Sequence, residues 1–160
     1  MADELVQEIE TAFAGAKNPG RERLVEYPDY WESPSVIESF AGTHWNDVPL
    51  DTLINHRLSL PLFTPEAFRF YLPAFLRAAV AHPAAVDTLT ENLFFMLTPP
   101  EAPGPEMDLF LRRLNGLNAA QMAVIRKFIK LYNETETSYP DAQRERAASF
   151  WEKYAETDET

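Results

Sequence analysis

The chain has 160 residues, no cysteine and a formal net charge of −11 at neutral pH. A chain of this length suits one domain, which buries about 70% of its unfolded surface. The missing cysteines exclude disulfides, thiolate catalysis and cysteine-ligated metals. The negative charge argues against a general nucleic-acid binder, because phosphates would be repelled.

The sequence shows no sign of membrane insertion or secretion. No apolar run approaches the roughly 20 residues that a membrane helix needs. The first ten residues, MADELVQEIE, are acidic and lack the basic and then apolar pattern of a signal peptide. We therefore expect a cytoplasmic protein with no membrane partner.

The N-terminal third alternates between helical and irregular patterns. Apolar residues recur every three or four positions over residues 3–16, which predicts an amphipathic helix. Residues 17–33 are polar and irregular. Ser33 and Pro34 then resemble a helix cap followed by a proline in the first turn, so we expect a short helix that ends at Gly42. Another short helix is predicted from Pro49 to about residue 55.

The central stretch, residues 65–82, predicts one long helix with a proline inside it. Thr64 and Pro65 form a typical helix start, and apolar residues then keep one phase across Pro73. Pro73 itself falls outside the apolar face. Because an internal proline removes a backbone hydrogen bond and clashes with the preceding turn, we expect a continuous helix that bends there.

Helical patterns continue to the C-terminus. We expect helices over residues 84–97 and 106–114, a helix behind Asn118, where Gln121 completes a capping box, and a last helix that starts at Pro140. The sequence therefore predicts an all-α fold. We expect a single compact domain of about six to eight helices over residues 1–155, followed by a polar tail at residues 156–160.

A resemblance supports this prediction. The pattern Phe40-x-Gly42-x-x-Trp45, the stretch TPEAFRFYLPAFL with Pro73, the pair Leu117 and Gln121, and the late pair Phe150-Trp151 resemble a bacterial domain family of unknown function. The resemblance covers about residues 1–155. It implies a small stand-alone bacterial protein of the cytoplasm whose bent helix is a family feature, and it brings no activity, ligand or catalytic residue.

Residues for catalysis or metal binding are few. The chain has three scattered histidines, His44, His56 and His82, and lacks the helical His motifs of metalloenzymes, so we expect no metal and no cofactor. It also lacks a nucleophile elbow and a glycine-rich phosphate loop. A serine or threonine paired with His44 or His56 stays open, but nothing in the sequence points to it.

Three parts of the sequence are candidates for binding. Tyr27, Tyr30 and Trp31 alternate with Glu26, Asp29 and Glu32 in the irregular segment, where they could contact a basic partner or pin the loop to the core. Trp45 could be an exposed anchor or a lid on the core. Five basic residues and no acid occupy residues 109–133, which suits either charge pairing between helices or an anion patch.

Two functions follow as hypotheses. The first is a non-catalytic interaction module with a basic protein partner, by analogy with immunity proteins that neutralise toxins. The second is an enzyme or small-ligand binder with a pocket near the bend at Pro73, lined by Trp45, Arg69 and Tyr71. An acidic and aromatic surface at residues 26–32 would favour the first, and a deep polar cavity at the bend would favour the second.

Overall fold

The computed structural model describes residues 2–86, 88–135 and 141–158 and confirms the all-α prediction, with eight α-helices in the described residues. The α-helices are α1 (Ala2–Ala12), α2 (Ser33–Phe40), α3 (Leu50–Asn55), α4 (Pro65–Ala81), α5 (Leu89–Met96), α6 (Pro105–Leu114), α7 (Ala119–Thr135) and α8 (Asp141–Asp158). Three short 3₁₀ turns join them: η1 (Arg21–Arg23), η2 (Trp45–Asp47) and η3 (Leu60–Leu62).

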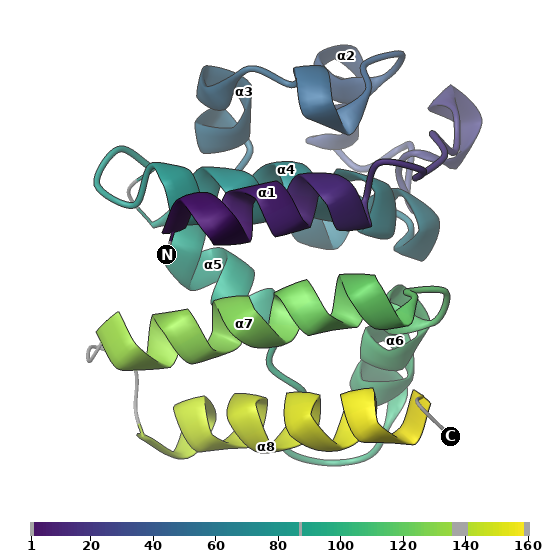
Figure 1. Ribbon diagram of the computed structural model, residues 1–160. Helices are drawn as coiled ribbons and strands as arrows, with labels where there is room; N and C mark the ends of the chain where they lie inside the picture. The colour runs from purple at the N-terminus through teal and green to yellow at the C-terminus, as the bar shows by residue number, and fades with distance from the viewer. Residues whose placement is uncertain (1, 87, 136–140, 159–160) are drawn as a thin grey trace.

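Helix α4 lies at the centre of the molecule. It packs against α1, α3, α5, α6, α7 and η2, and α7 in turn packs against α1 and α8. Figure 1 shows α1, α7 and α8 side by side with their axes nearly parallel, α4 behind α1, and α2 and α3 on the far side of α4 from α7. One hydrophobic core, which includes Ile9, Phe68, Ile125 and Trp151, extends through all of these layers.

The predicted start of α4 is confirmed in detail. The Thr64 hydroxyl accepts a hydrogen bond from the backbone nitrogen of Ala67 at 3.0 Å, and Pro65 follows in the first helical turn. The helix then continues across Pro73 to Ala81 without interruption, as the apolar phase predicts. The bend at Pro73 stays a prediction.

The placement of Pro73 outside the apolar face was wrong. Pro73 is buried, and so is Phe70 beside it, because α4 is covered on nearly every side and buries 12 of its 17 residues. An amphipathic pattern locates one apolar face, but a central helix needs burial all round.

Two predicted N-caps had different outcomes. Asn118 and Gln121 form the expected reciprocal pair, with the Gln121 nitrogen 2.8 Å from Asn118 Oδ1 and the Asn118 nitrogen 3.0 Å from Gln121 Oε1. Ser33 does not cap α2, because Glu32 precedes the helix and the Ser33 hydroxyl instead donates to the Tyr27 carbonyl.

Three predicted helix bounds also differ. Helix α1 ends at Ala12 rather than at residue 16, and α5 begins at Leu89 rather than at residue 84, since residues 83–86 form a turn. Helix α8 continues to Asp158, which lies inside the predicted tail. Pro140, the predicted start of the last helix, lies outside the described residues.

A glycine after α6 makes a close approach possible. Gly116 has a φ of +112°, a conformation that side chains disfavour, and an added Cβ atom would lie 3.1 Å from Arg69 Nε. By contrast, Gly15 has nothing within 4 Å of such an atom and no positive φ.

We therefore predict that Gly116→Ala lowers the free energy of unfolding by about 1–3 kcal/mol through backbone strain and crowding of Arg69. Gly15→Ala is the control and should change stability much less. Urea denaturation of the three proteins measures both effects, and an equal loss in the two variants would contradict this account.

Candidate functional site

Residues 26–32 form a loop whose aromatic side chains face solvent. Tyr27 is 70% exposed, Trp31 76% and Tyr30 43%. The rings of Tyr30 and Trp31 lie 6.0 Å apart, centroid to centroid, at 48° to each other. These rings therefore do not pin the loop to the core, which was the alternative interpretation of this segment.

Backbone and hydroxyl hydrogen bonds fix the course of this loop. The buried Ser33 hydroxyl donates to the Tyr27 carbonyl at 2.7 Å, and the Tyr30 nitrogen donates to the same carbonyl at 3.1 Å. The Ser33 nitrogen donates to the Tyr30 carbonyl at 3.0 Å. At the first residue of the loop, the Glu26 nitrogen donates to the Leu62 carbonyl, which joins the loop to η3. The exposed rings thus project from a backbone segment that is held by hydrogen bonds at both of its ends, at Glu26 and at Ser33.

Acidic side chains accompany the rings. Glu26 and Asp29 are exposed and Glu32 is half-buried. Within the described part of the chain, none of the three takes part in a salt bridge. Their carboxylates are therefore available to a positively charged partner.

Glu32 lies near a histidine that is held between two serines. His56 Nε2 is 2.9 Å from Ser39 Oγ, and His56 Nδ1 is 3.1 Å from Ser59 Oγ. Burial lowers the pKa of His56, and the negative charge of Glu32 partly opposes that shift. Sequence reasoning could not pair Ser39 with His56, because 17 residues separate them and no motif marks the pair. The bonds connect the end of α2 to the segment between α3 and η3.

The three residues predicted to line a pocket at the bend of α4 each donate a hydrogen bond to the backbone. The indole nitrogen of the buried Trp45 donates to the Phe13 carbonyl at 3.2 Å, just beyond α1. The Tyr71 hydroxyl lies 2.7 Å from the Phe40 carbonyl at the end of α2 and 2.8 Å from that of Thr43.

Arg69 acts in the same way at the end of α6. Its Nη1 atom lies 2.9 Å from the Arg112 carbonyl and 3.2 Å from the Arg113 carbonyl. Beside it lies a hollow of about 150 Å³, to which Glu66 and Gln121 also contribute.

Trp45 has the position of a lid on the core, covered by the guanidinium of Arg77 at 5.2 Å from its ring centroid. All three predicted residues thus stabilise helix ends.

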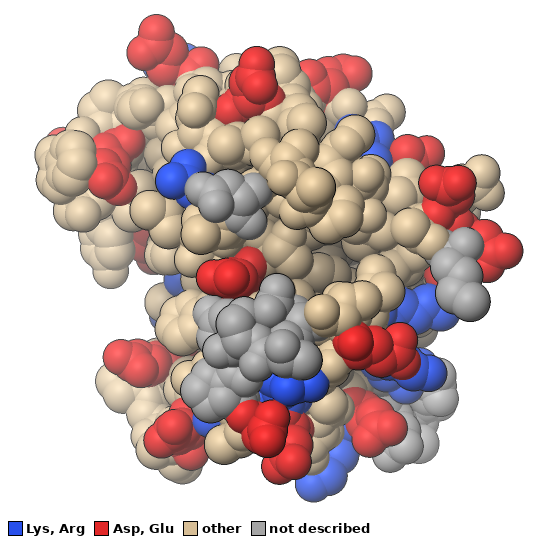
Figure 2. Space-filling model, turned by 90° about the vertical axis from the view of Figure 1, so that its left-hand side faces the viewer, with Lys and Arg blue, Asp and Glu red and all other residues tan. Residues whose placement is uncertain are grey.

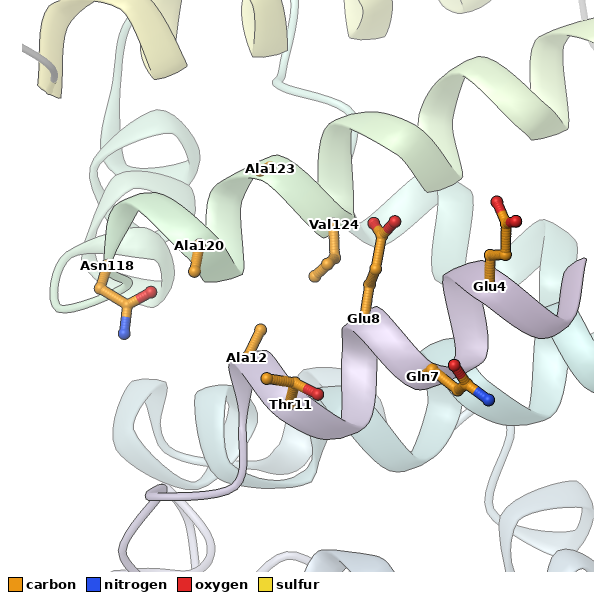
Figure 3. A pocket seen from close by; sticks show the side chains of 9 residues that line it. All are labelled: Glu4, Gln7, Glu8, Thr11, Ala12, Asn118, Ala120, Ala123 and Val124. Carbon is orange, nitrogen blue, oxygen red and sulfur yellow. The ribbon is translucent and has the colours of Figure 1, made fainter. Parts of the chain in front are cut away.

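A larger groove runs between α1 and α7 and has a volume of about 750 Å³. Figure 3 shows its lining, with Ala12 and Val124 directed into the space between the two helices and Glu4 and Glu8 along α1. Lys127 bridges the helices through an ion pair with Glu8 at 2.6 Å. The titratable groups in the lining are the carboxylates of Glu4 and Glu8, and that of Glu8 is already paired with Lys127.

The basic segment of residues 109–133 is used in part for charge pairing. Lys127 pairs with Glu8 of α1, whereas Arg126 and Lys130 form no salt bridge with any described residue. In the view of Figure 2, acidic side chains are spread over the whole face, and basic ones gather mainly at the height of α7 and α8.

Two further features bear on function. Among the described residues, no group of three or more His, Asp or Glu side chains is arranged to hold a metal ion. Within the same ranges, none of the helices has the length and apolarity needed to cross a membrane.

An all-helical domain with capped helix ends and an exposed acidic and aromatic loop thus defines the molecule. Its sequence matches the model of a family of unknown function, DUF6714, over residues 1–155. The chain belongs to this family, which confirms the predicted membership of a family of unknown function. No curated protein and no solved structure matches the chain.

The position of Tyr71 gives a testable pH effect. Burial raises the pKa of its hydroxyl to about 12, above the ordinary value of 10 that we expect in the unfolded chain. Folding therefore favours the protonated form, so its stabilising contribution is complete below pH 10 and disappears as the pH rises through 12.

We predict that Tyr71→Phe lowers the free energy of unfolding by about 1–3 kcal/mol at pH 8, because two carbonyls lose their donor. The difference from the wild type should shrink between pH 10 and pH 12. Tyr30→Phe, at an exposed ring, is the control and should match the wild type throughout. A pH-independent difference for Tyr71→Phe, measured by denaturant unfolding, would argue against this assignment.

Proposed function

We propose that this protein is a non-catalytic interaction module that binds a basic protein partner through the loop of residues 26–32. The observation that carries the proposal is the exposure of Tyr27, Tyr30 and Trp31 together in one hydrogen-bonded loop. Large rings of this kind supply much of the binding energy at protein interfaces, and they lose little conformational entropy when they are already held in place.

Charge gives this proposal its class of partner. The chain carries a net charge of −11, and Glu26, Asp29 and Glu32 flank the rings. A field of this sign accelerates encounter with positively charged proteins and disfavours acidic ones. A setting that fits is an immunity-like protein of the bacterial cytoplasm, whose partner is a basic toxin.

The other hypothesis, an enzyme or a small-ligand binder with a pocket near Pro73, has less support. Trp45 Nε1, Arg69 Nη1 and the Tyr71 hydroxyl donate to backbone carbonyls, so a ligand would have to compete for these three donors. The hollow beside Arg69, at about 150 Å³, is also smaller than the 300–1,000 Å³ that is typical of ligand pockets.

Photocrosslinking in the native host can identify the partner. A photoreactive phenylalanine analogue placed at Trp31 should yield a specific adduct with a basic protein, and the same analogue at Leu58, an exposed position outside the loop, should not. A crosslink to an acidic protein, or equal yields of the adduct at the two positions, would contradict the proposal.

With the partner purified, we predict that two classes of substitution act on different rates. Neutralising Glu26, Asp29 and Glu32 to the amides should slow association and flatten its salt dependence, because these charges act on encounter. Tyr30→Ala or Trp31→Ala should accelerate dissociation and cost about 2 kcal/mol or more if the ring is an anchor.

Folding must be unaffected for this comparison to be valid. Because Trp31 is 76% exposed, Trp31→Ala should change the free energy of unfolding by about 0.5 kcal/mol or less, whereas Trp45→Ala in the core should cost about 3–5 kcal/mol. Surface plasmon resonance and thermal melting measure the two effects. A Trp31→Ala protein that binds as tightly as the wild type would exclude this loop as the interface.

A further inference from the structure

A second site stands out where α5, α6 and η3 meet the N-terminal part of α8. A hollow of about 310 Å³ lies there, with a mainly apolar lining. Its apolar residues include Pro61, Phe95, Pro99, Pro100, Leu109 and Phe110. Phe95 is 60% exposed, which is unusual for a phenylalanine next to the core. An apolar ligand could therefore reach the hollow from solvent.

Two arginines line the same hollow and differ in their contacts. Arg146 donates from Nε to the Pro99 carbonyl at 2.9 Å and pairs with Glu101 at 3.5 Å. Arg113 forms no salt bridge with a described residue, and its Nε atom is buried with no hydrogen-bond acceptor. Its guanidinium lies over the ring of Phe68, 5.8 Å from the centroid.

The Arg113 guanidinium is thus a half-buried cation with incomplete hydrogen bonding. Burial lowers the pKa of Arg113, the positive charge of Arg112 adds to the shift, and the negative charge of Glu26 opposes it. An arginine still remains charged at neutral pH. A buried donor without an acceptor is unfavourable, so an anion placed against Arg113 would be stabilising.

The charges nearby restrict the kind of anion. Glu106 lines the hollow and Glu26 acts on Arg113 from the neighbouring loop, so a doubly charged group such as phosphate would meet two carboxylates. A single carboxylate matches the planar guanidinium and brings only one negative charge. The apolar walls then suit a hydrocarbon or aromatic group joined to that carboxylate.

We propose that this hollow binds a monocarboxylate joined to an apolar group, with the carboxylate on Arg113 and the apolar group against Phe95, Phe110 and the prolines. Two sources offer this chemistry, a free apolar carboxylic acid and the C-terminus of a peptide that ends in an apolar residue. The charge of Glu26 acts on Arg113, but no residue of the loop at residues 26–32 lines the hollow, so a failure of either proposal leaves the other intact.

Nuclear magnetic resonance on the full chain can test the site with defined probes. The probes are 4-phenylbutyrate, its uncharged amide, and the peptide acetyl-Gly-Gly-Phe with a free or an amidated C-terminus. We expect the two carboxylates to shift the Arg113 Nε–H signal and the Phe95 and Phe110 amide signals in a saturable way. The two amides should bind about tenfold more weakly or not at all.

Substitutions separate a specific site from general attraction. Arg113→Gln should weaken 4-phenylbutyrate binding about tenfold or more. Arg112→Gln removes the same charge from the adjacent, exposed position outside the hollow and should leave the affinity unchanged within about twofold. If Arg113→Gln does not fold, Phe95→Ala is the second variant, since this exposed ring should be dispensable for folding and should contribute several-fold to the affinity.

Each outcome has a clear consequence. If the free-acid peptide binds more tightly than 4-phenylbutyrate, the site is supported and its natural ligand is a peptide C-terminus. If 4-phenylbutyrate binds and the peptide does not, the site is supported and its natural ligand is a small carboxylic acid. The absence of saturable shifts, equal binding of acids and amides, or equal losses in Arg112→Gln and Arg113→Gln would overturn the proposal.

Discussion

The C-terminal ends of the helices are the points at which this fold is held together. The last carbonyls of an α-helix have no partner within the helix, and proteins often satisfy them with a glycine that turns the chain back. Positive-φ glycines follow α2 and α6, at Gly42 and Gly116, and side chains from other segments also donate to the carbonyls at the helix ends. These contacts link Trp45 and Gln121 to α1, Tyr71 to α2, Trp151 to α5, Arg69 to α6 and Arg144 to α7.

This arrangement explains why the most specific sequence pattern is structural. The stretch TPEAFRFYLPAFL contains Arg69 and Tyr71 two residues apart, and these two side chains hold the ends of α6 and α2. A central helix that also donates to the ends of its neighbours fixes their directions as well as their distances. Loss of one such donor leaves a partner carbonyl unsatisfied, which costs about 1–3 kcal/mol when that carbonyl is buried.

Local signals in the sequence predicted local features well. The Thr64 cap and the Asn118 and Gln121 pair follow from the spacing of three residues, because the groups involved lie within one helical turn. The helical periodicity likewise predicted α4 across Pro73. Burial of Pro73 does not follow from the apolar phase, because it depends on the helices that cover the second side of α4.

The candidate site also has features that local sequence predicted and features that depend on distant residues. Segment 26–32 could be recognised from its composition, but the bond from the Ser33 hydroxyl to the Tyr27 carbonyl could not, because the sequence predicts Ser33 as a helix cap. Trp45, Arg69 and Tyr71 were grouped as the lining of one pocket beside α4, and the hollow next to Arg69 is lined by neither Trp45 nor Tyr71. Their chemistry depends on carbonyls 28 to 44 residues away, which no spacing rule reveals.

The comparison of Arg69 with Arg113 shows which arginine the helix-end contacts leave without a full set of hydrogen-bond acceptors. Burial lowers the pKa of both guanidinium groups, so both are partly removed from water. Arg69 is compensated by two carbonyls, one of which belongs to Arg113 itself. The Arg113 side chain, on the penultimate residue of α6, faces the ring of Phe68 and an apolar hollow. In the proposed site a bound carboxylate supplies the acceptor that the Arg113 guanidinium lacks, and the apolar walls around it favour a molecule that is itself mostly apolar.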